Sequence, residues 1–149
     1  MVIENLNDLK NLAKKIAINL KEKDVILLKG DLGAGKTSLV TYIAEFLNSK
    51  DKVSSPSFSL VNIYRADIVI NHLDLYRLED EKEIESFNFE DYFYPIKSLT
   101  FIEWPEMAKS YLPKKYSTIE IIKIDNNKRD INIFGKLKER MEENWKYLL

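Results

Sequence analysis

Apolar residues recur every three or four positions in two stretches near the start of the chain, and this spacing predicts two helices. The first helix is expected from Leu6 to Leu20 and the second from Lys36 to Leu47. Between them, residues 24–30 read DVILLKG, a short apolar run ended by a glycine, which is typical of a buried strand. The first third of the chain is therefore predicted to run helix, strand, glycine-rich loop and helix.

The rest of the chain alternates between short β-like runs and turns. The run SLVNIYR is followed, after a turn near Ala66, by DIVINHLDLYR, so the two are expected to form an antiparallel hairpin. LTFIEW predicts a buried strand that Pro105 ends, and TIEIIKI and DINIF flank the turn DNNKR. The expected elements are strands at 59–65, 67–77, 99–104, 118–124 and 130–134, a short acidic helix at 79–87 and a terminal helix at 136–149.

Length and composition limit the classes of function. The 149 residues have the length of one ordinary domain. Lys and Arg number 23 and Asp and Glu 24, so no overall charge directs the chain to nucleic acid, and the lack of cysteine excludes disulfides and thiolate metal sites. The opening MVIENLNDLK lacks the basic and apolar regions of a signal peptide, and no apolar run approaches the roughly 18 residues of a membrane span. We therefore expect a cytoplasmic protein.

The segment Gly30–Thr37, GDLGAGKT, matches the phosphate-binding pattern G-x-x-x-x-G-K-[ST] completely. Its glycines let successive backbone N–H groups converge on phosphate oxygens, and the following helix points its positive end at the same oxygens. Lys36 can reach between the β- and γ-phosphates, and the Thr37 hydroxyl can join the shell of a Mg²⁺ ion. A glycine-rich turn that only reverses the chain is the alternative, which the flanking strand and helix disfavour. The expected phosphate-binding residues are Asp31, Gly33, Ala34, Gly35, Lys36, Thr37 and Ser38.

The tetrapeptide Asn127-Lys128-Arg129-Asp130 raises the alternative of a GTPase, because many GTPases recognise guanine through N-K-x-D. GTPases also carry D-x-x-G to sense the γ-phosphate, and none of the four glycines here has an Asp three positions before it. The tetrapeptide lies between two β-like runs, where Asn and Asp commonly form hairpin turns. We therefore interpret it as a turn and expect ATP as the nucleotide.

Together, the elements and the loop predict an α/β protein with a P-loop NTPase-like fold. We expect a three-layer α/β/α arrangement, in which a mixed sheet has parallel core strands and antiparallel hairpin extensions. Since no repeat, low-complexity tract or linker interrupts the chain, residues 1–149 are expected to form a single P-loop ATPase domain.

Two carboxylates at the ends of predicted strands could order a metal ion and the attacking water. Glu103 ends LTFIE, an apolar strand closed by a carboxylate, which is the arrangement that carries Mg²⁺ chemistry in P-loop proteins. Asp74 ends INHLD, and for it a functional acid and an ordinary surface acid are equally open. His72 is the single histidine, so no histidine cluster can hold a metal, and a hydrogen-bonded structural role is favoured for it.

The segments GDLGAGKTSLV, SSPSFSLVNIY, HLDLYRL, DYF and FIEWPE, in this order and in so short a chain, resemble the TsaE (YjeE) family. The resemblance spans Gly30 to Glu106, and its specific part is H-x-D-L-Y-R followed by E-W-P. It implies a small bacterial ATPase, using ATP and Mg²⁺, that is needed for threonylcarbamoyl modification of the adenosine beside the anticodon. In such a system a TsaD and TsaB pair transfers the group to tRNA, and TsaE binds that pair and hydrolyses ATP to sustain turnover.

By position, the resemblance assigns roles to several residues. Glu103 would complete the metal shell with Thr37, Asp74 would be a functional acid near the γ-phosphate, and Trp104 would lie beside the nucleotide or a partner surface. The loop Ser54–Ser57 would act as a switch, with Ser55-Pro56-Ser57 in place of the usual S-P-T. A basic residue of the late hairpin would lie near the nucleotide.

That basic residue is Arg129, or Lys128 if the alignment slips by one position. The N-terminal segment would help to hold the base, but no motif there assigns a contact to a particular residue. The near-zero net charge fits a protein that meets tRNA mainly through its partners.

Two other functions fit a P-loop with two acids. A nucleotide or small-molecule kinase would transfer phosphate to an acceptor, but such an enzyme usually carries an arginine-bearing lid. Arg65 and Arg77 stand apart on the predicted hairpin, and the only other arginines are Arg129 and Arg140. An interaction module gated by nucleotide would not hydrolyse it, and the complete set of phosphate-loop and strand-end residues disfavours that role.

Aromatic residues at two places have a structural or a docking interpretation. The segment DYFYPI at 91–96 could form a docking patch or lie buried beneath a loop. Trp145 in the terminal helix is expected in the core.

Overall fold

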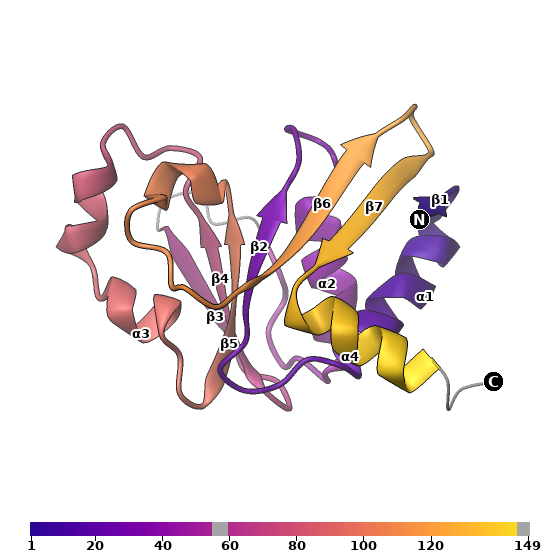
Figure 1. Cartoon of the computed structure of the whole chain (residues 1–149), viewed down its shortest axis with the longest axis horizontal. Coiled ribbons are helices and arrows are strands. Elements are labelled where there is room, and N and C mark those ends of the chain that lie inside the picture. The colour runs from indigo at the N-terminus through magenta and orange to yellow at the C-terminus, as the bar shows by residue number, and fades with distance from the viewer. Residues whose placement is uncertain (55–59, 146–149) are drawn as a thin grey trace.

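One mixed sheet of seven strands forms the centre of residues 1–54 and 60–145, the part of the chain that the computed structural model describes (Figure 1). Across the sheet the strands are ordered β1-β7-β6-β2-β5-β4-β3. Their bounds are β1 (Val2–Ile3), β2 (Val25–Lys29), β3 (Val61–Tyr64), β4 (Val69–Asp74), β5 (Ser98–Glu103), β6 (Ser117–Lys123) and β7 (Arg129–Phe134).

The strand directions confirm the predicted combination of a parallel core with antiparallel extensions. β6, β2, β5 and β4 run parallel to one another, whereas β3 pairs antiparallel with β4, and β7 pairs antiparallel with β6 and β1. β4 therefore belongs both to the predicted hairpin and to the parallel core. Since parallel strands end at one edge of the sheet, Asp74 and Glu103 are register partners there, beside the loop that leaves β2.

Helices cover both faces of the sheet, as the three-layer prediction requires. α1 (Leu6–Ala17), α2 (Lys36–Phe46) and α4 (Lys136–Trp145) share one hydrophobic cluster with Ile26 and Leu28 of β2. The 3₁₀ helices η1 (Glu81–Ser86) and η2 (Pro105–Ala108), together with the short helix α3 (Phe89–Phe93), share a second cluster with Leu27. Alternate residues of β2 thus enter opposite clusters, which explains why its sequence is a continuous apolar run.

Short elements differ most from the sequence prediction. The acidic helix expected at 79–87 is the 3₁₀ helix η1, and β1, α3 and η2 were not predicted because two to five residues are too few for a hydrophobic period to emerge. The DYFYPI segment is partly buried and partly exposed: Phe93 is fully buried, whereas 71% of Ile96 is exposed. Most of the predicted switch loop, residues 55–57, and the side chain of Trp145 lie outside the described residues. None of the helices among the described residues is long and apolar enough to cross a membrane.

Candidate functional site

The phosphate-binding loop follows β2 and turns directly into α2, as predicted. Gly35 begins the helix with a φ of 110°, a left-handed conformation that glycine adopts without strain. A Cβ atom on Gly30 would lie 2.7 Å from the carbonyl oxygen of Ile121, so β6 leaves no room for a side chain there. These two glycines let the loop curl tightly between β2, β6 and the N-terminus of α2.

Lys36 lies beneath this loop, with only 6% of the residue exposed. Its Nζ donates a hydrogen bond of 2.5 Å to the carbonyl oxygen of Gly30 and lies 3.9 Å from the centroid of the Trp104 ring. Burial lowers the pKa of Lys36, while the surrounding carboxylates oppose this shift, Glu103 first and Asp74 next. Two further acids, Glu106 and Asp31, act in the same direction. The four carboxylates together help to keep the Lys36 ammonium protonated.

Glu103 and Thr37, the two side chains predicted to hold a metal ion, are in contact at the carboxyl end of β5. The Thr37 hydroxyl donates to Oε2 of Glu103 over 3.2 Å, and Nε2 of His72 lies 2.6 Å from the same oxygen. Glu103 is 3% exposed and His72 is completely buried. His72 is thus hydrogen-bonded, as expected, and its two partners are the candidate metal acid Glu103 and the Tyr64 hydroxyl.

Asp74 and Trp104 frame the same edge of the sheet. Asp74 ends β4, is half-buried, and accepts a hydrogen bond of 3.1 Å from the backbone N–H of Tyr76. Trp104 follows Glu103 with a left-handed φ of 56°, and its ring centroid lies 4.9 Å from that of Tyr76. The indole of Trp104 lies over the Lys36 ammonium, and the carboxylates of Glu103 and Asp74 act on the same group.

Arg129 contacts the phosphate-binding loop from the opposite side. Its Nε donates to the carbonyl oxygen of Ala34 over 2.8 Å, and its Nη1 donates to the carbonyl oxygens of Asp125 and Lys128 over 2.7 and 3.0 Å. The guanidinium therefore ties the hairpin turn to the loop. Of Arg129 and Lys128, the two basic residues that the sequence left open, Arg129 is the one with a side-chain hydrogen bond to the phosphate-binding loop.

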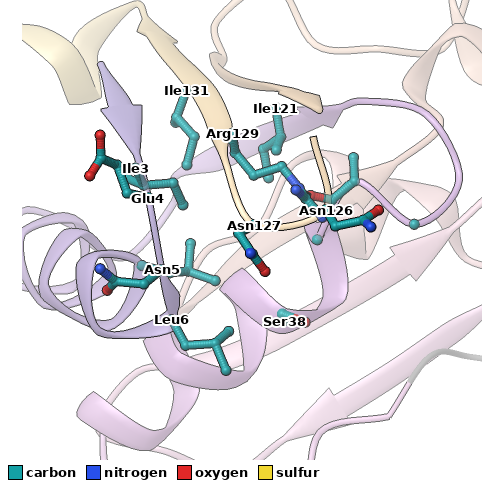
Figure 2. Close-up of a pocket in the computed structure, with 14 residues that line it drawn as sticks. Ile3, Glu4, Asn5, Leu6, Ser38, Ile121, Asn126, Asn127, Arg129 and Ile131 are labelled. Atoms are coloured by element: carbon teal, nitrogen blue, oxygen red, sulfur yellow. The ribbon is translucent and has the colours of Figure 1, made fainter. Parts of the chain in front are cut away.

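A cavity of about 470 Å³ continues from the loop past Arg129 (Figure 2). Ligand pockets commonly enclose about 300–1,000 Å³. Figure 2 shows the N-terminal segment on one side of the cavity and the β6–β7 turn on another. The lining is apolar at Ile3, Leu6, Leu9, Ile121 and Ile131, polar at Glu4, Asn5, Asn126, Asn127 and Arg129, and completed by Gly33, Ala34, Gly35 and Ser38.

Most residues that line this cavity were not predicted from the sequence, because they come from both ends of the chain. The sequence predicted a turn at 127–130, and this is correct for Asn127 and Lys128, whose N–H groups each donate a hydrogen bond of 2.8 Å to the Asp125 carboxylate. Arg129 and Asp130 instead begin β7, where they pair with Lys123 and Ile122 of β6. Asp130, the acid of N-K-x-D, is not part of the cavity lining and forms an ion pair of 3.2 Å with the Met1 amino group. The tetrapeptide thus contributes Asn127 and Arg129 to the cavity lining, but not its acid, Asp130.

A metal ion here would depend on a ligand that brings its own oxygens. Within residues 1–54 and 60–145, no group of three or more His, Asp or Glu side chains could hold a metal ion. Thr37 and Glu103 supply two oxygen-bearing side chains within 3.2 Å of each other. This set fits Mg²⁺, which proteins commonly hold with one or two side chains together with phosphate oxygens and water.

Comparisons with known proteins agree with this architecture. The family model described as "Threonylcarbamoyl adenosine biosynthesis protein TsaE" matches residues 3–131. A TsaE protein of Rickettsia conorii is 39% identical over 136 residues, covering 90% of this chain and 77% of the relative, and one of Aquifex aeolicus is 36% identical over 139 residues, covering 91% and 96%.

Both relatives are named tRNA threonylcarbamoyladenosine biosynthesis protein TsaE. The crystal structure of YdiB from Bacillus subtilis superposes with a TM-score of 0.80 at 25% identity, covering all of this chain and 95% of the other. A family match across most of the chain, relatives above one-third identity and a shared fold all point the same way, and this chain belongs to the TsaE family.

Proposed function

We propose that this protein binds and hydrolyses ATP in support of threonylcarbamoyl transfer to tRNA adenosine, as an accessory to a TsaD and TsaB pair. The observation that carries the proposal is the convergence of Lys36, Thr37 and Glu103 at the edge of the sheet, where Thr37 and Glu103 are 3.2 Å apart. The names of the relatives supply the pathway, and the phosphate-binding loop supplies the nucleotide.

Phosphate binding is assigned to the loop and the start of α2. The backbone N–H groups of Gly33, Ala34 and Gly35 would face phosphate oxygens at a helix N-terminus, where the helix dipole favours negative charge. Lys36 would exchange its bond with the Gly30 carbonyl for a phosphate oxygen, since a lysine ammonium has three donors on a flexible stem. Asp31 and Ser38 border this segment on either side.

Thr37 and Glu103 would hold Mg²⁺, which when bound offsets the charge of the β- and γ-phosphates. Asp74, the register partner of Glu103, would orient a water molecule and accept its proton. Trp104 covers the ammonium of Lys36 and would limit the access of bulk water to it. Each of these tasks uses a side chain at the same edge of the sheet.

The base would occupy the cavity beside Arg129. Apolar walls at Ile3, Leu6 and Ile121 suit the faces of a purine, and the amides of Asn126 and Asn127 suit its edges. ATP is favoured over GTP because Asp130, the acid that would mark guanine, lies outside the lining and pairs with the Met1 amino group.

Phosphate transfer to another acceptor is less well supported. Kinases use arginines that close over the phosphates. Here Arg65 pairs with Asp51 at 2.9 Å, Arg140 pairs with Asp24 at 2.6 Å, and Arg129 binds the Ala34 carbonyl, so these three guanidinium groups act within the fold. Water is therefore the proposed acceptor, the cell compartment is the cytoplasm, and tRNA would be contacted mainly through the partners.

The test is to measure ATP and GTP hydrolysis by the purified protein, alone and with a TsaD–TsaB pair. We expect slow ATP hydrolysis that the partners change, reduced by about 100-fold or more in Lys36→Ala and Glu103→Ala. Lys123→Ala and Glu120→Gln on β6 are matched controls that should retain activity. A preference for GTP would contradict the assignment of the base, and activity indifferent to the partners would contradict the accessory role.

A further inference from the structure

A chain of four buried or half-buried polar side chains links α2 to β3 through the interior of the protein. It runs from Thr37 to Glu103 on β5, to His72 on β4 and to Tyr64 on β3, with distances of 3.2, 2.6 and 2.9 Å between successive partners. We propose that His72 and Tyr64 are positioning residues that hold the Glu103 carboxylate in place and couple it to the backbone at Ser54. This inference rests on the proposed function, in which Glu103 holds Mg²⁺.

The strands put the three sheet residues on one face, below α2. Side chains alternate between the two faces of a strand, and Ile70 on β4 and Phe101 on β5 belong to the same cluster as α2. His72 and Glu103 lie two positions beyond these residues, so they share that face. Tyr64 belongs to the same cluster and is the register partner of Ile70.

Burial makes each of these contacts consequential. Tyr64 and Glu103 are each 3% exposed, and His72 is fully buried. A polar group in such a place strongly disfavours any geometry that leaves it without a hydrogen-bond partner. The Glu103 carboxylate therefore has few alternatives to the position in which its Oε2 accepts both the Thr37 hydroxyl and His72.

The arrangement of hydrogens follows from the partners. Oε2 of Glu103 accepts the Thr37 hydroxyl, so we place the hydrogen of the 2.6 Å contact with the same oxygen on His72 Nε2. In that tautomer Nδ1 is an acceptor, and the Tyr64 hydroxyl lies 2.9 Å from it, within reach to donate. Second-shell partners of this kind commonly fix the orientation of a metal ligand.

Tyr64 connects this arrangement to Ser54. The single hydroxyl hydrogen of Tyr64 has two acceptors at the same distance, 2.9 Å: His72 Nδ1 and the Ser54 carbonyl oxygen. When the Tyr64 hydroxyl donates to His72, the Ser54 carbonyl oxygen still accepts a hydrogen bond of 3.1 Å from the Asn62 amide. A displacement of Ser54 thus changes whether Tyr64 donates to Ser54 or to His72. Through His72, it also changes how firmly the Glu103 carboxylate is held.

The first experiment measures how much Mg²⁺ is needed for tight binding of ADP, followed by tryptophan fluorescence. We expect His72→Asn, whose amide is too short to reach Glu103, to raise the Mg²⁺ requirement by about 10-fold, with ADP binding without Mg²⁺ unchanged. His72→Gln, whose amide nitrogen can replace Nε2, should restore most of the loss. Equal losses in the two variants, or losses in binding without Mg²⁺, would overturn the positioning role.

Tyr64→Phe tests the outer half of the chain and keeps the ring in the core. It should raise the Mg²⁺ requirement by about 3-fold, whereas Tyr42→Phe on α2 should leave it unchanged. In the Glu103→Ala background, Tyr64→Phe should have no further effect, because residues acting through one network are not additive. Additive effects would show that Tyr64 acts elsewhere and would overturn the coupling.

A second measurement does not depend on nucleotide binding. His72 is the only histidine in the chain, so the imidazole signals in a long-range ¹H–¹⁵N spectrum can be assigned to it directly. We expect hydrogen on Nε2, and a shift of the Nδ1 signal in Tyr64→Phe. Hydrogen on Nδ1 alone would overturn the proposal, and absence of ADP binding in the unmodified protein would contradict the proposed function but not this result.

Discussion

The two sides of the phosphate-binding loop are built in opposite ways. On the side of β5, Glu103 and His72 are almost completely buried, and they connect to the loop through the Thr37 hydroxyl. On the side of β7, the cavity has buried apolar walls but an exposed polar rim that includes Glu4 and Asn127, and Arg129 connects it to the loop through the Ala34 carbonyl. The first side is a closed network and the second is an open pocket.

This difference separates two kinds of dependence. In the closed network, each group has few alternative partners, so one change should alter the others and act on metal binding. In the open pocket, exposed residues contribute individually and water can replace them, so changes there should act on nucleotide affinity in small and nearly independent steps.

The largest effect is expected from Gly30→Ala, because it breaks the loop that both sides share. The added Cβ would lie 2.7 Å from the Ile121 carbonyl oxygen, and the displacement should cost about 2–3 kcal/mol of folding free energy, as overpacking does. We expect a melting temperature lower by roughly 5–10 °C and loss of nucleotide binding with and without Mg²⁺.

The control is Gly33→Ala. A Cβ there would meet nothing within 4 Å, so only its φ of 79° disfavours alanine, at a cost of about 1–2 kcal/mol. Thermal unfolding measures both variants. Equal losses would mean that the close approach of β6 is not what shapes the loop.

A smaller effect is expected from Arg129→Ala, which opens the pocket side alone. Removing the guanidinium takes the donor from the Ala34 carbonyl and from the turn, and should weaken ADP binding by about 10-fold, or about 1.4 kcal/mol. Isothermal titration should find the same loss with and without Mg²⁺. Lys128→Ala is the matched control, because the Lys128 side chain does not line the cavity. A changed Mg²⁺ requirement in Arg129→Ala would erase the proposed distinction between the two sides.

The smallest effect concerns the pH dependence of the buried side. Burial lowers the pKa of Lys36 below its ordinary value of 10.5, so ADP affinity should fall with rising pH before an exposed lysine would lose its proton. In that window the unfolded chain binds more protons than the folded one, so folding stability should rise with pH while affinity falls. Binding and unfolding measured between about pH 8 and 10.5 check the two signs.

Asp74→Asn sharpens this prediction. Asp74 is one of the acids that raise the pKa of Lys36, so its neutralisation should move the loss of ADP affinity to lower pH. Lys36→Ala should remove this component of the pH profile. A profile that is unchanged in Asp74→Asn would show that this acid does not act on the ammonium.

The sequence was most informative where local chemistry suffices. The motif at Gly30–Thr37 predicted a loop between a strand and a helix, and β2 and α2 flank it as expected, since glycine placement and hydrophobic periodicity are local properties. Apolar runs likewise predicted β5 ending at Glu103 and the hairpin of β3 with β4. The short elements β1, α3 and η2 were not predicted, because packing against the rest of the fold stabilises them and they are too short to show a hydrophobic period.

The sequence by itself determined the phosphate-binding loop, the parallel core and the acids at strand ends. Tertiary structure alone decided which distant residues complete the site. Strand order places β6 against Gly30 and the β6–β7 turn beside the N-terminal segment, so the pocket joins Ile3 to Asn127. It also aligns Tyr64, His72 and Glu103 on three adjacent strands. The physical reason is that the order of strands in a sheet follows from the burial of whole faces, which no local stretch of sequence records.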